Sequence, residues 1–307
     1  MIKKILLIGG TSLIGPHLIK ELLNENYTVA TFTRGGKSFL TETSFQGDRN
    51  NTSDLDRVIN DFSPEIIVDM IPFTKIQAII LSDLIKDKNI PLVAISSADI
   101  YCAYAKLHQT EEIDYQLCPI LETGNLRKKL GPEGKKYNKL AVENIYLNYL
   151  SNVIILRLPA VYGFPDTTRI DPYLLPMLQK QKEISISSYK INWKFSRALN
   201  KNCAYGIFLT IKHHRTGQHI YNIAEETTHT EVEWIRKIAK ICGWKGTIKT
   251  QTGLSEDRGY KQDLYISSRK IRVELDYYEK YNPDNGLEEN VLMSAYQYLG
   301  KSYSKGY

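Results

Sequence analysis

Near its amino end, the sequence has a short apolar run that stops at two glycines and is followed at once by a helical pattern. The run is Lys4–Ile8, and Gly9 and Gly10 come directly after it. The buried stripe of the helix is formed by Ile14, Leu18 and Leu22. A strand, a tight turn and a helix in this order can hold a dinucleotide pyrophosphate on the free N–H groups of the helix start. We therefore predict that the chain is built around a nucleotide cofactor.

The spacing of the small residues in this turn departs from the usual pattern at one position. Gly9 and Gly15 occupy two of the three glycine places, and Ser12 takes the middle one. Serine is the smallest replacement, and its hydroxyl can cap the helix or bond a phosphate. Pro16 falls in the first helical turn, where its missing N–H has no cost. The predicted cofactor contacts of the turn are Gly9, Gly10, Thr11, Ser12, Leu13, Ile14 and Gly15.

The end of the second strand predicts which dinucleotide binds. Arg34 follows Gly15 by 19 positions, the distance at which such folds contact the adenosine ribose. An acid there would accept from a free 2′-hydroxyl, whereas a guanidinium matches a 2′-phosphate. We therefore predict NADP as the cofactor, with NAD as the alternative. Asp48 and Arg49, after a short third strand, are assigned to the adenine or to the phosphate.

Short β-branched runs alternate with helical patterns throughout the first half of the chain. Because the runs are continuously apolar, we expect parallel strands covered on both faces. Strands are predicted at Lys4–Ile8, Thr28–Thr33, Ile66–Met70, Leu92–Ser96 and Val153–Leu158, and helices near 12–25, 54–61, 75–87 and 136–149. This alternation predicts an α/β fold with a Rossmann-type, doubly wound parallel sheet.

After Gly163 the rhythm changes, and prolines interrupt the pattern. The predicted elements are a helix near 172–181, a strand at His219–Ile223 that returns to the main sheet, a helix from Thr230 with Glu233 completing a capping box, and helices near 268–275 and 287–299. We predict a dinucleotide-binding domain over 1–164, completed by about 197–224. A smaller, discontinuous substrate-binding lobe is predicted over 165–196 and 225–307.

The charge and the cysteines narrow the class of partner. The 40 Lys and Arg against 34 Asp and Glu give a net charge of +6, and the positive residues are scattered. Diffuse charge suits small phosphate-bearing molecules and disfavours nucleic acid. The four cysteines have no metal-ligand spacing, so we predict no metal site and a reduced compartment. No segment is long and apolar enough to cross a bilayer. We therefore expect a cytoplasmic enzyme without membrane contact.

Several segments occur in an order that is typical of one enzyme family. They are Ile8–Gly15, Ile95–Tyr101, Tyr137–Glu143 and Arg157–Gly163, followed by Tyr221–Ile223 and Ser268–Leu275. Together they resemble the extended short-chain dehydrogenase/reductase family, in its NAD-dependent epimerase/dehydratase branch. The resemblance covers nearly the whole chain.

The resemblance implies roles for particular residues. A strand-end serine hydrogen-bonds the reacting oxygen of the substrate, a tyrosine is the general acid/base, and a lysine holds the nicotinamide ribose and lowers the tyrosine pKa. Ser97 takes the serine place, and Lys139 takes the lysine place because the residues after it match the family run. A desolvated ammonium beside a phenol favours the phenolate. The remaining implied contacts are Pro159 and Lys139 to the cofactor, and Ser97, Tyr101 and Arg197 to the substrate.

The catalytic tyrosine is where the sequence departs from the family. Lys135 stands four residues before Lys139, on the helical face that tyrosine should share, and Tyr137 is only two before it. In one interpretation, the helix starts only near Tyr137, after Gly131–Gly134, and Tyr137 can turn inward as the acid/base. In the other, the acid/base is absent, and Lys135, water or a substrate group replaces it, or no redox chemistry occurs.

The leading hypothesis is an NAD(P)-dependent oxidoreductase, epimerase or dehydratase that moves a hydride at a hydroxyl or keto carbon. Its substrate is expected to be a sugar-like or small hydroxylated metabolite. Ala160 stands where nucleotide-sugar members carry an asparagine, which removes one diphosphate contact. The alternatives are an NADP-binding regulator or scaffold that has lost the catalytic tyrosine, and an RNA-associated relative, which the diffuse charge disfavours. A homodimer is expected by analogy alone.

Overall fold

A seven-stranded parallel sheet forms the centre of the computed structural model, which describes residues 4–35, 41, 43–252 and 259–300. Its strands are β1 (Lys4–Ile8), β2 (Thr28–Thr33), β3 (Thr43–Gln46), β4 (Ile66–Asp69), β5 (Leu92–Ser97), β6 (Val153–Leu158) and β10 (Gln218–Asn222). They lie in the order β10-β6-β5-β4-β1-β2-β3, and every neighbouring pair is parallel. The predicted doubly wound sheet is confirmed, and so is the return of the strand near 219–223.

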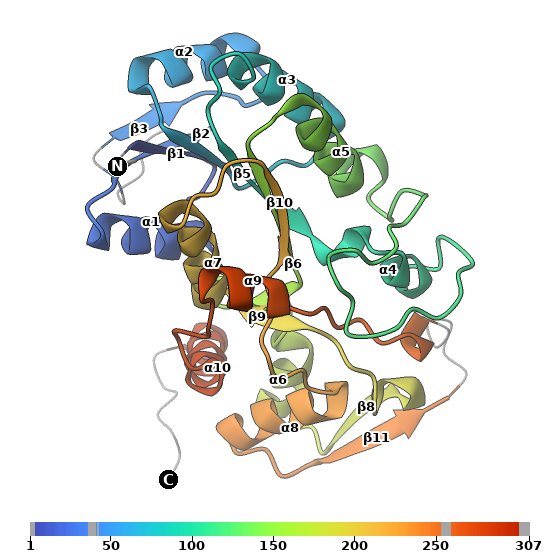
Figure 1. Ribbon diagram of the computed structural model, residues 1–307. Coiled ribbons are helices and arrows are strands. Elements are labelled where there is room, and N and C mark those ends of the chain that lie inside the picture. Colours follow the sequence, from blue (N-terminus) through green and yellow to red (C-terminus); the bar gives the residue numbers. More distant parts are fainter. Residues whose placement is uncertain (1–3, 36–40, 42, 253–258, 301–307) are drawn as a thin grey trace.

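Helices cover both faces of this sheet (Figure 1). The helices on one face are α2 (Thr52–Phe62), α3 (Lys75–Ile85) and α5 (Lys139–Tyr149); those on the other are α1 (Gly15–Asn24), α7 (Asn200–Lys212) and α9 (Arg269–Leu275). Successive residues of β1 enter opposite cores: Leu7 packs with α1 and α7, and Leu6 packs with α2 and α3. Strands buried on both sides need apolar residues at every position, which explains their continuous apolar runs.

The later part of the chain adds a smaller lobe with its own core. Its elements are β7 (Ala160–Tyr162), α6 (Asp171–Leu178), β8 (Glu183–Ser187), β9 (Arg197–Leu199), α8 (Glu231–Cys242), β11 (Thr247–Gln251) and α10 (Pro283–Leu299). Trp234 of α8 packs on Tyr162 with ring centroids 5.1 Å apart. The predicted capping box is confirmed, because Glu233 N donates to Thr230 Oγ1 at 3.3 Å and Thr230 N donates to Glu233 Oε2 at 2.8 Å.

Two sequence predictions on helices need correction. The helix predicted near 136–149 begins at Lys139, because Gly134–Lys136 form a separate 3₁₀ turn and the Asn138 side chain caps Ala141 N. The short helix α4 (Cys102–Leu107) was not expected. None of the helices in the described ranges combines the length and the apolar character that a membrane span requires.

Candidate active site

The glycine turn follows β1 and leads into α1, at the carboxyl edge of the sheet. Gly9 and Gly10 adopt positive φ angles of 87° and 92°, which glycine reaches without steric cost. A Cβ on Gly15 would stand 2.0 Å from the Gly10 carbonyl oxygen, so no side chain fits there. No side chain caps the start of α1. The positive end of the α1 dipole is therefore not occupied by a capping side chain, which leaves it open to an anion such as a dinucleotide pyrophosphate.

Leu13, which lies between Gly10 and the start of α1, is held in an unusual conformation. Leu13 has a φ of 45°, which is uncommon for a residue with a side chain. Its carbonyl accepts a hydrogen bond from Asn200 Nδ2 at 3.2 Å, at the start of α7. Thr11 and Ser12 are exposed, and the Ser12 carbonyl accepts from Gly15 N at 3.0 Å. This hydrogen bond from the start of α7 thus helps to hold the shape of the turn.

A cleft of about 480 Å³ opens beside this turn. It is lined by Ile8–Ser12, Phe32–Gly35, Gly47–Asn50, Ile71, Phe73 and Gln77. The cleft lies at the carboxyl ends of β1, β2 and β4, beside the point between β1 and β4 where the strand order reverses and where such sheets bind dinucleotides. The shape of the cleft, the glycines and the uncapped helix all fit a dinucleotide.

Arg34 and Asp48 both line the cleft and both are exposed. Asp48 Oδ1 accepts from Asn50 N at 2.9 Å and from Asn50 Nδ2 at 2.7 Å, and these bonds hold the pKa of the carboxyl below its ordinary value. Arg49, in contrast, is only 6% exposed. Its Nη1 and Nη2 donate to Asp69 at 2.6 and 2.8 Å. The Arg49 charge is therefore balanced inside the protein, whereas Arg34 faces the cleft.

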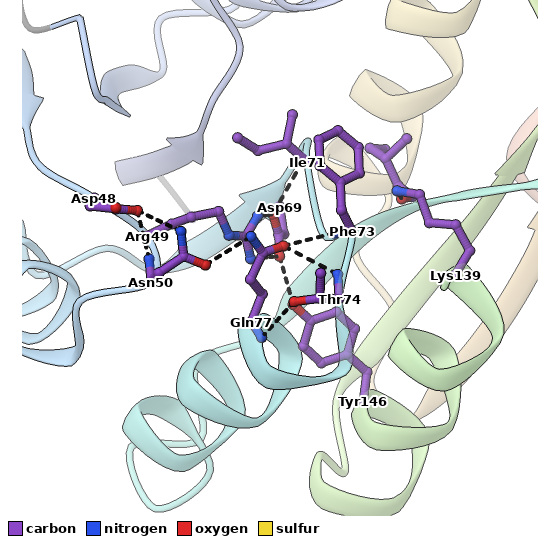
Figure 2. Close-up of polar contacts among 11 residues, drawn as sticks. Asp48, Arg49, Asn50, Asp69, Ile71, Phe73, Thr74, Gln77, Lys139 and Tyr146 are labelled. Atoms are coloured by element: carbon purple, nitrogen blue, oxygen red, sulfur yellow. Dashed lines mark hydrogen bonds and ion pairs between the residues drawn. The ribbon is translucent and has the colours of Figure 1, made fainter. Parts of the chain in front are cut away.

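Asp69, at the end of β4, is completely buried and belongs to a polar network that the sequence did not reveal. Besides the Arg49 guanidinium, it accepts a hydrogen bond of 2.6 Å from the Tyr146 hydroxyl on α5. Figure 2 shows the three side chains pointing toward one another beneath the cleft. A buried charge needs such partners to be tolerated. The network ties the loop after β3 to β4 and to the helix that carries Lys139.

Ser97 and Tyr137 meet at the carboxyl end of β5. The Ser97 hydroxyl oxygen accepts from Asp99 N at 3.2 Å, which leaves its proton free to point elsewhere. Burial raises the pKa of Tyr137, and a hydrogen bond with Ser97 acts in the opposite direction. At neutral pH Tyr137 is therefore a protonated phenol beside a serine hydroxyl.

Lys139 completes this group from the first residue of α5. Its side chain is 3% exposed, and Nζ donates to the Ile95 carbonyl at 2.8 Å. Nζ also lies 5.5 Å from the ring centroid of Tyr137. Burial lowers the pKa of Lys139 to about 7; Asp69 opposes this effect and Arg49 adds to it. The Lys139 ammonium is thus held close to Tyr137, and its burial removes the water that would hydrate the charge.

The residue at which α5 begins determines how the spacing between Tyr137 and Lys139 is interpreted. Lys135 is exposed and lies in the 3₁₀ turn before the helix, so helical spacing does not relate it to Lys139. Tyr137 has an extended conformation, with φ −140° and ψ 92°. An extended residue two positions before Lys139 can turn its side chain to the same site. The arrangement agrees with the first of the two interpretations of the sequence, a non-helical tyrosine that turns inward.

Tyr101 and Arg197, the two other residues predicted to contact the substrate, are both buried. Tyr101 is fully buried; its hydroxyl donates to Asn222 Oδ1 at 2.7 Å and accepts from Arg157 Nη1 at 3.0 Å. Arg197 is also buried and forms an ion pair with Glu231. Both side chains have protein partners, so a substrate contact would require these networks to open. Pro159 is half-buried between β6 and β7.

No group of three His, Cys, Asp or Glu side chains within the described part of the chain is arranged to hold a metal ion. The site consists of a cleft beside the glycine turn and a nearby group of a serine, a tyrosine and a lysine, which Phe73 of the cleft wall contacts. This combination defines a Rossmann-fold enzyme of the dehydrogenase/reductase type.

Comparisons with known proteins assign the family. The model of the NAD-dependent epimerase/dehydratase family matches residues 5–224, and the chain belongs to this family. It is accordingly an enzyme of the short-chain dehydrogenase/reductase type, as the sequence predicted. No curated protein matches the sequence at a significant level.

Solved structures with the same fold include sugar-nucleotide enzymes. A dTDP-glucose 4,6-dehydratase from Bacillus anthracis in complex with NAD has a TM-score of 0.73 at 20% identity, covering 98% of each chain. A UDP-N-acetylglucosamine 4-epimerase from Bacillus cereus has a TM-score of 0.75 at 20% identity, covering 95% of this chain and 99% of that one. A UDP-glucose 4-epimerase from Thermotoga maritima with UDP-glucose has a TM-score of 0.73 at 16% identity, covering 96% and 99%.

Proposed function

We propose that this protein is a nicotinamide-dependent epimerase or dehydratase that acts on a nucleotide-linked sugar. The observation that carries the proposal is the meeting of Ser97, Tyr137 and Lys139 next to Phe73, which lines the cleft beside the glycine turn. Family membership supports the reaction class. The substrates named for structures of the same fold, dTDP-glucose and UDP-sugars, support the substrate class.

In this proposal each residue has one task. When bound, the cofactor supplies hydride exchange at the substrate carbon. Tyr137 exchanges the proton of the substrate oxygen, and its raised pKa keeps it protonated for donation at neutral pH. Ser97 donates to the same oxygen and orients it. Lys139 holds the cofactor ribose with the Nζ protons that do not bond Ile95, and below its pKa of about 7 it places a positive charge near the phenol.

Turnover assays test this function. Purified protein with NAD⁺ or NADP⁺ is offered UDP-glucose, UDP-N-acetylglucosamine and dTDP-glucose, with products separated by chromatography and reduced cofactor followed by absorbance. Tyr137→Phe removes the proton donor and is expected to lower kcat about 10²- to 10⁴-fold. Lys135→Met, at an exposed position two residues away, is the matched control and should retain activity. Equal activity in Tyr137→Phe and the parent would refute the catalytic role of Tyr137.

The preference for NADP over NAD is a separate proposal, supported by the exposed Arg34 at the cleft. A charged hydrogen bond to the 2′-phosphate is worth about 1.5–3 kcal/mol. Arg34→Ala should therefore weaken NADPH binding about 10- to 100-fold and change NADH binding by less than about 2-fold. Calorimetric titration of each variant with both cofactors measures this difference. An equal loss for both cofactors would contradict a 2′-phosphate contact.

The cellular setting of the enzyme is also proposed. The four cysteines are all unpaired in the structure, which supports a reducing, cytoplasmic location. A homodimer is proposed by analogy to other enzymes of this type, and light scattering of the purified protein tests it. If the protein binds a cofactor tightly but turns over none of the sugars, the alternative of a cofactor-binding regulator is favoured.

A further inference from the structure

Tyr137 lies outside the helix that carries Lys139, so something other than helical geometry must hold the two together. Its backbone N–H has only a long bond of 3.3 Å to the Gly134 carbonyl. The next residue is fixed better, because Asn138 N donates to the Phe73 carbonyl at 2.8 Å. Phe73 belongs to the loop between β4 and α3, more than sixty residues earlier. This loop is therefore the partner that anchors the tyrosine segment.

The Phe73 side chain makes two further contacts with the same group. Its ring packs on the Tyr137 ring, with centroids 5.7 Å apart and planes tilted by 37°. Lys139 Nζ lies 5.0 Å from the Phe73 ring centroid and 5.5 Å from that of Tyr137. The ammonium thus sits near two aromatic rings, an arrangement that attracts a cation and shields it from water. Phe73 contacts both proposed catalytic side chains at once.

Phe73 is itself held from the cofactor side. Its N–H donates to Gln77 Oε1 at 2.9 Å, and Gln77 Nε2 donates to Asn50 Oδ1 at 3.0 Å. Figure 2 shows Gln77 at the start of α3, between Asn50 and the Phe73 loop. Phe73, Gln77 and Asn50 all line the cofactor cleft. With 39% of its surface exposed, Phe73 is far from a buried core residue. It therefore lines the cleft and packs on the ring of Tyr137 at the same time.

We propose that Phe73 is a positioning residue, which holds Tyr137 against Lys139 and shields this pair from water at the end of the cofactor cleft. The proposal deepens the proposed function and rests on its assignment of Tyr137 and Lys139. A hydrophobic ring is required because it contacts one phenol and one ammonium together. Bulk alone, as in leucine, would fill the space without offering an aromatic face to the ammonium.

The test uses NMR titration of the apo protein labelled with ¹³Cε-lysine and ¹³Cζ-tyrosine, and needs no substrate. The Lys139 and Tyr137 signals are assigned by their loss in Lys139→Met and Tyr137→Phe. In Phe73→Ala, water reaches the ammonium, and the Lys139 midpoint should rise by at least about one pH unit. The Tyr137 midpoint should fall toward that of an exposed tyrosine. Phe73→Leu, which still excludes water but offers no aromatic face, should lower the Lys139 midpoint, and Phe73→Tyr, which keeps the ring, should retain both parental midpoints.

The control is Ile76→Ala, since Ile76 lies in the first turn of α3, is 67% exposed and does not line the cleft. It should leave both midpoints unchanged. If Phe73→Ala does not fold, the comparison of Phe73→Leu with Phe73→Tyr decides. Unchanged Lys139 and Tyr137 midpoints in a folded Phe73→Ala or Phe73→Leu protein would overturn the proposal.

Turnover distinguishes this proposal from the proposed function. With an active substrate, Phe73→Ala should lower kcat about tenfold or more and change the cofactor KM less. Shifted midpoints without turnover of any sugar would leave the positioning role intact and refute the enzymatic function. Normal kcat despite shifted midpoints would refute the positioning role in catalysis.

Discussion

Replacing Lys139 with methionine is expected to stabilise the folded protein at pH 6 while removing most of its activity. The ammonium is buried, and its pKa falls from 10.5 to about 7 on folding. This difference corresponds to a penalty of about 5 kcal/mol when the folded protein must hold the proton. Methionine fills the space without a charge but gives up the bond to the Ile95 carbonyl, which offsets about 1–3 kcal/mol. A net gain of about 2–4 kcal/mol is expected.

The dependence on pH separates this effect from simple packing. Below pH 7 both the folded and the unfolded chain hold the Lys139 proton, and the full penalty applies. Between pH 7 and 10.5 the unfolded chain binds a proton that the folded protein does not. The free energy of unfolding of the parent therefore rises with pH in this window. The advantage of Lys139→Met should disappear over the same window.

Urea unfolding of both proteins at several pH values measures this difference. Lys135→Met is the control, because Lys135 is exposed and its replacement should change stability by less than about 0.5 kcal/mol at every pH. In turnover assays with an active sugar nucleotide, Lys139→Met should lower kcat at least about 100-fold. A stability difference that is the same at pH 6 and pH 9.5 would show that Lys139 is not buried as a strained cation. If the prediction holds, the buried Lys139 ammonium lowers the stability of the protein in return for its function in the site.

The central sheet could be predicted from the sequence because its determinants are local. The inner strands β1, β4, β5 and β6 are largely apolar runs, and Gly9, Gly10 and Gly15 mark the turn after the first of them. Five predicted strands agree with the structure to within one residue at either end. The lobe strands escaped prediction, since they are short and pair across long stretches of sequence. β8 pairs with β11, and β7 pairs with β9. Tertiary context, not local pattern, makes such segments into strands.

The candidate site was predicted in part, and the missing part is equally informative. Ser97 and Lys139 are predicted from their resemblance to family motifs, and Tyr137 is one of two interpretations at a position that departs from the family; the structure brings the three together. The helical pattern predicts a start of α5 near residue 136, which is too early, because Asn138, a preferred capping residue, caps Ala141 N. Phe73 gave no signal, because a contact with residues so distant in sequence leaves no periodic pattern.

Asp69 left a signal that could have been followed. It ends an otherwise apolar strand, Ile66–Asp69, and an acid in a fully buried strand requires a partner. The sequence could not identify that partner, because Arg49 precedes it by 20 residues and Tyr146 follows it by 77. The sequence places Arg49 at the adenine or the phosphate, in the cleft that this residue lines. It does not predict that the Arg49 side chain is paired in the core beneath the cleft.

The pair formed by Arg49 and Asp69 leads to the second large prediction. Burial disfavours the charge on Arg49, but Asp69 outweighs this effect and raises the pKa of the guanidinium. Asp69→Asn removes the negative charge and leaves the buried Arg49 cation without compensation, which should cost about 3–5 kcal/mol of stability. The exposed pair Lys86–Asp83, 2.8 Å apart, offers a matched control. Asp83→Asn should cost far less than Asp69→Asn, because water screens the exposed pair.

The double variant Arg49→Met with Asp69→Leu shows whether the loss comes from the unpaired charge. Apolar side chains of similar volume have no charge to desolvate, so the double variant should recover most of the stability lost in Asp69→Asn. Adding Tyr146→Phe to this double variant should change the stability little, because the Tyr146 hydroxyl has already lost its partner Asp69. Chemical denaturation of the single and double variants gives the coupling energy. If Asp69→Asn lowers the stability no more than Asp83→Asn does, the buried ion pair does not stabilise the connection between the cofactor cleft and α5.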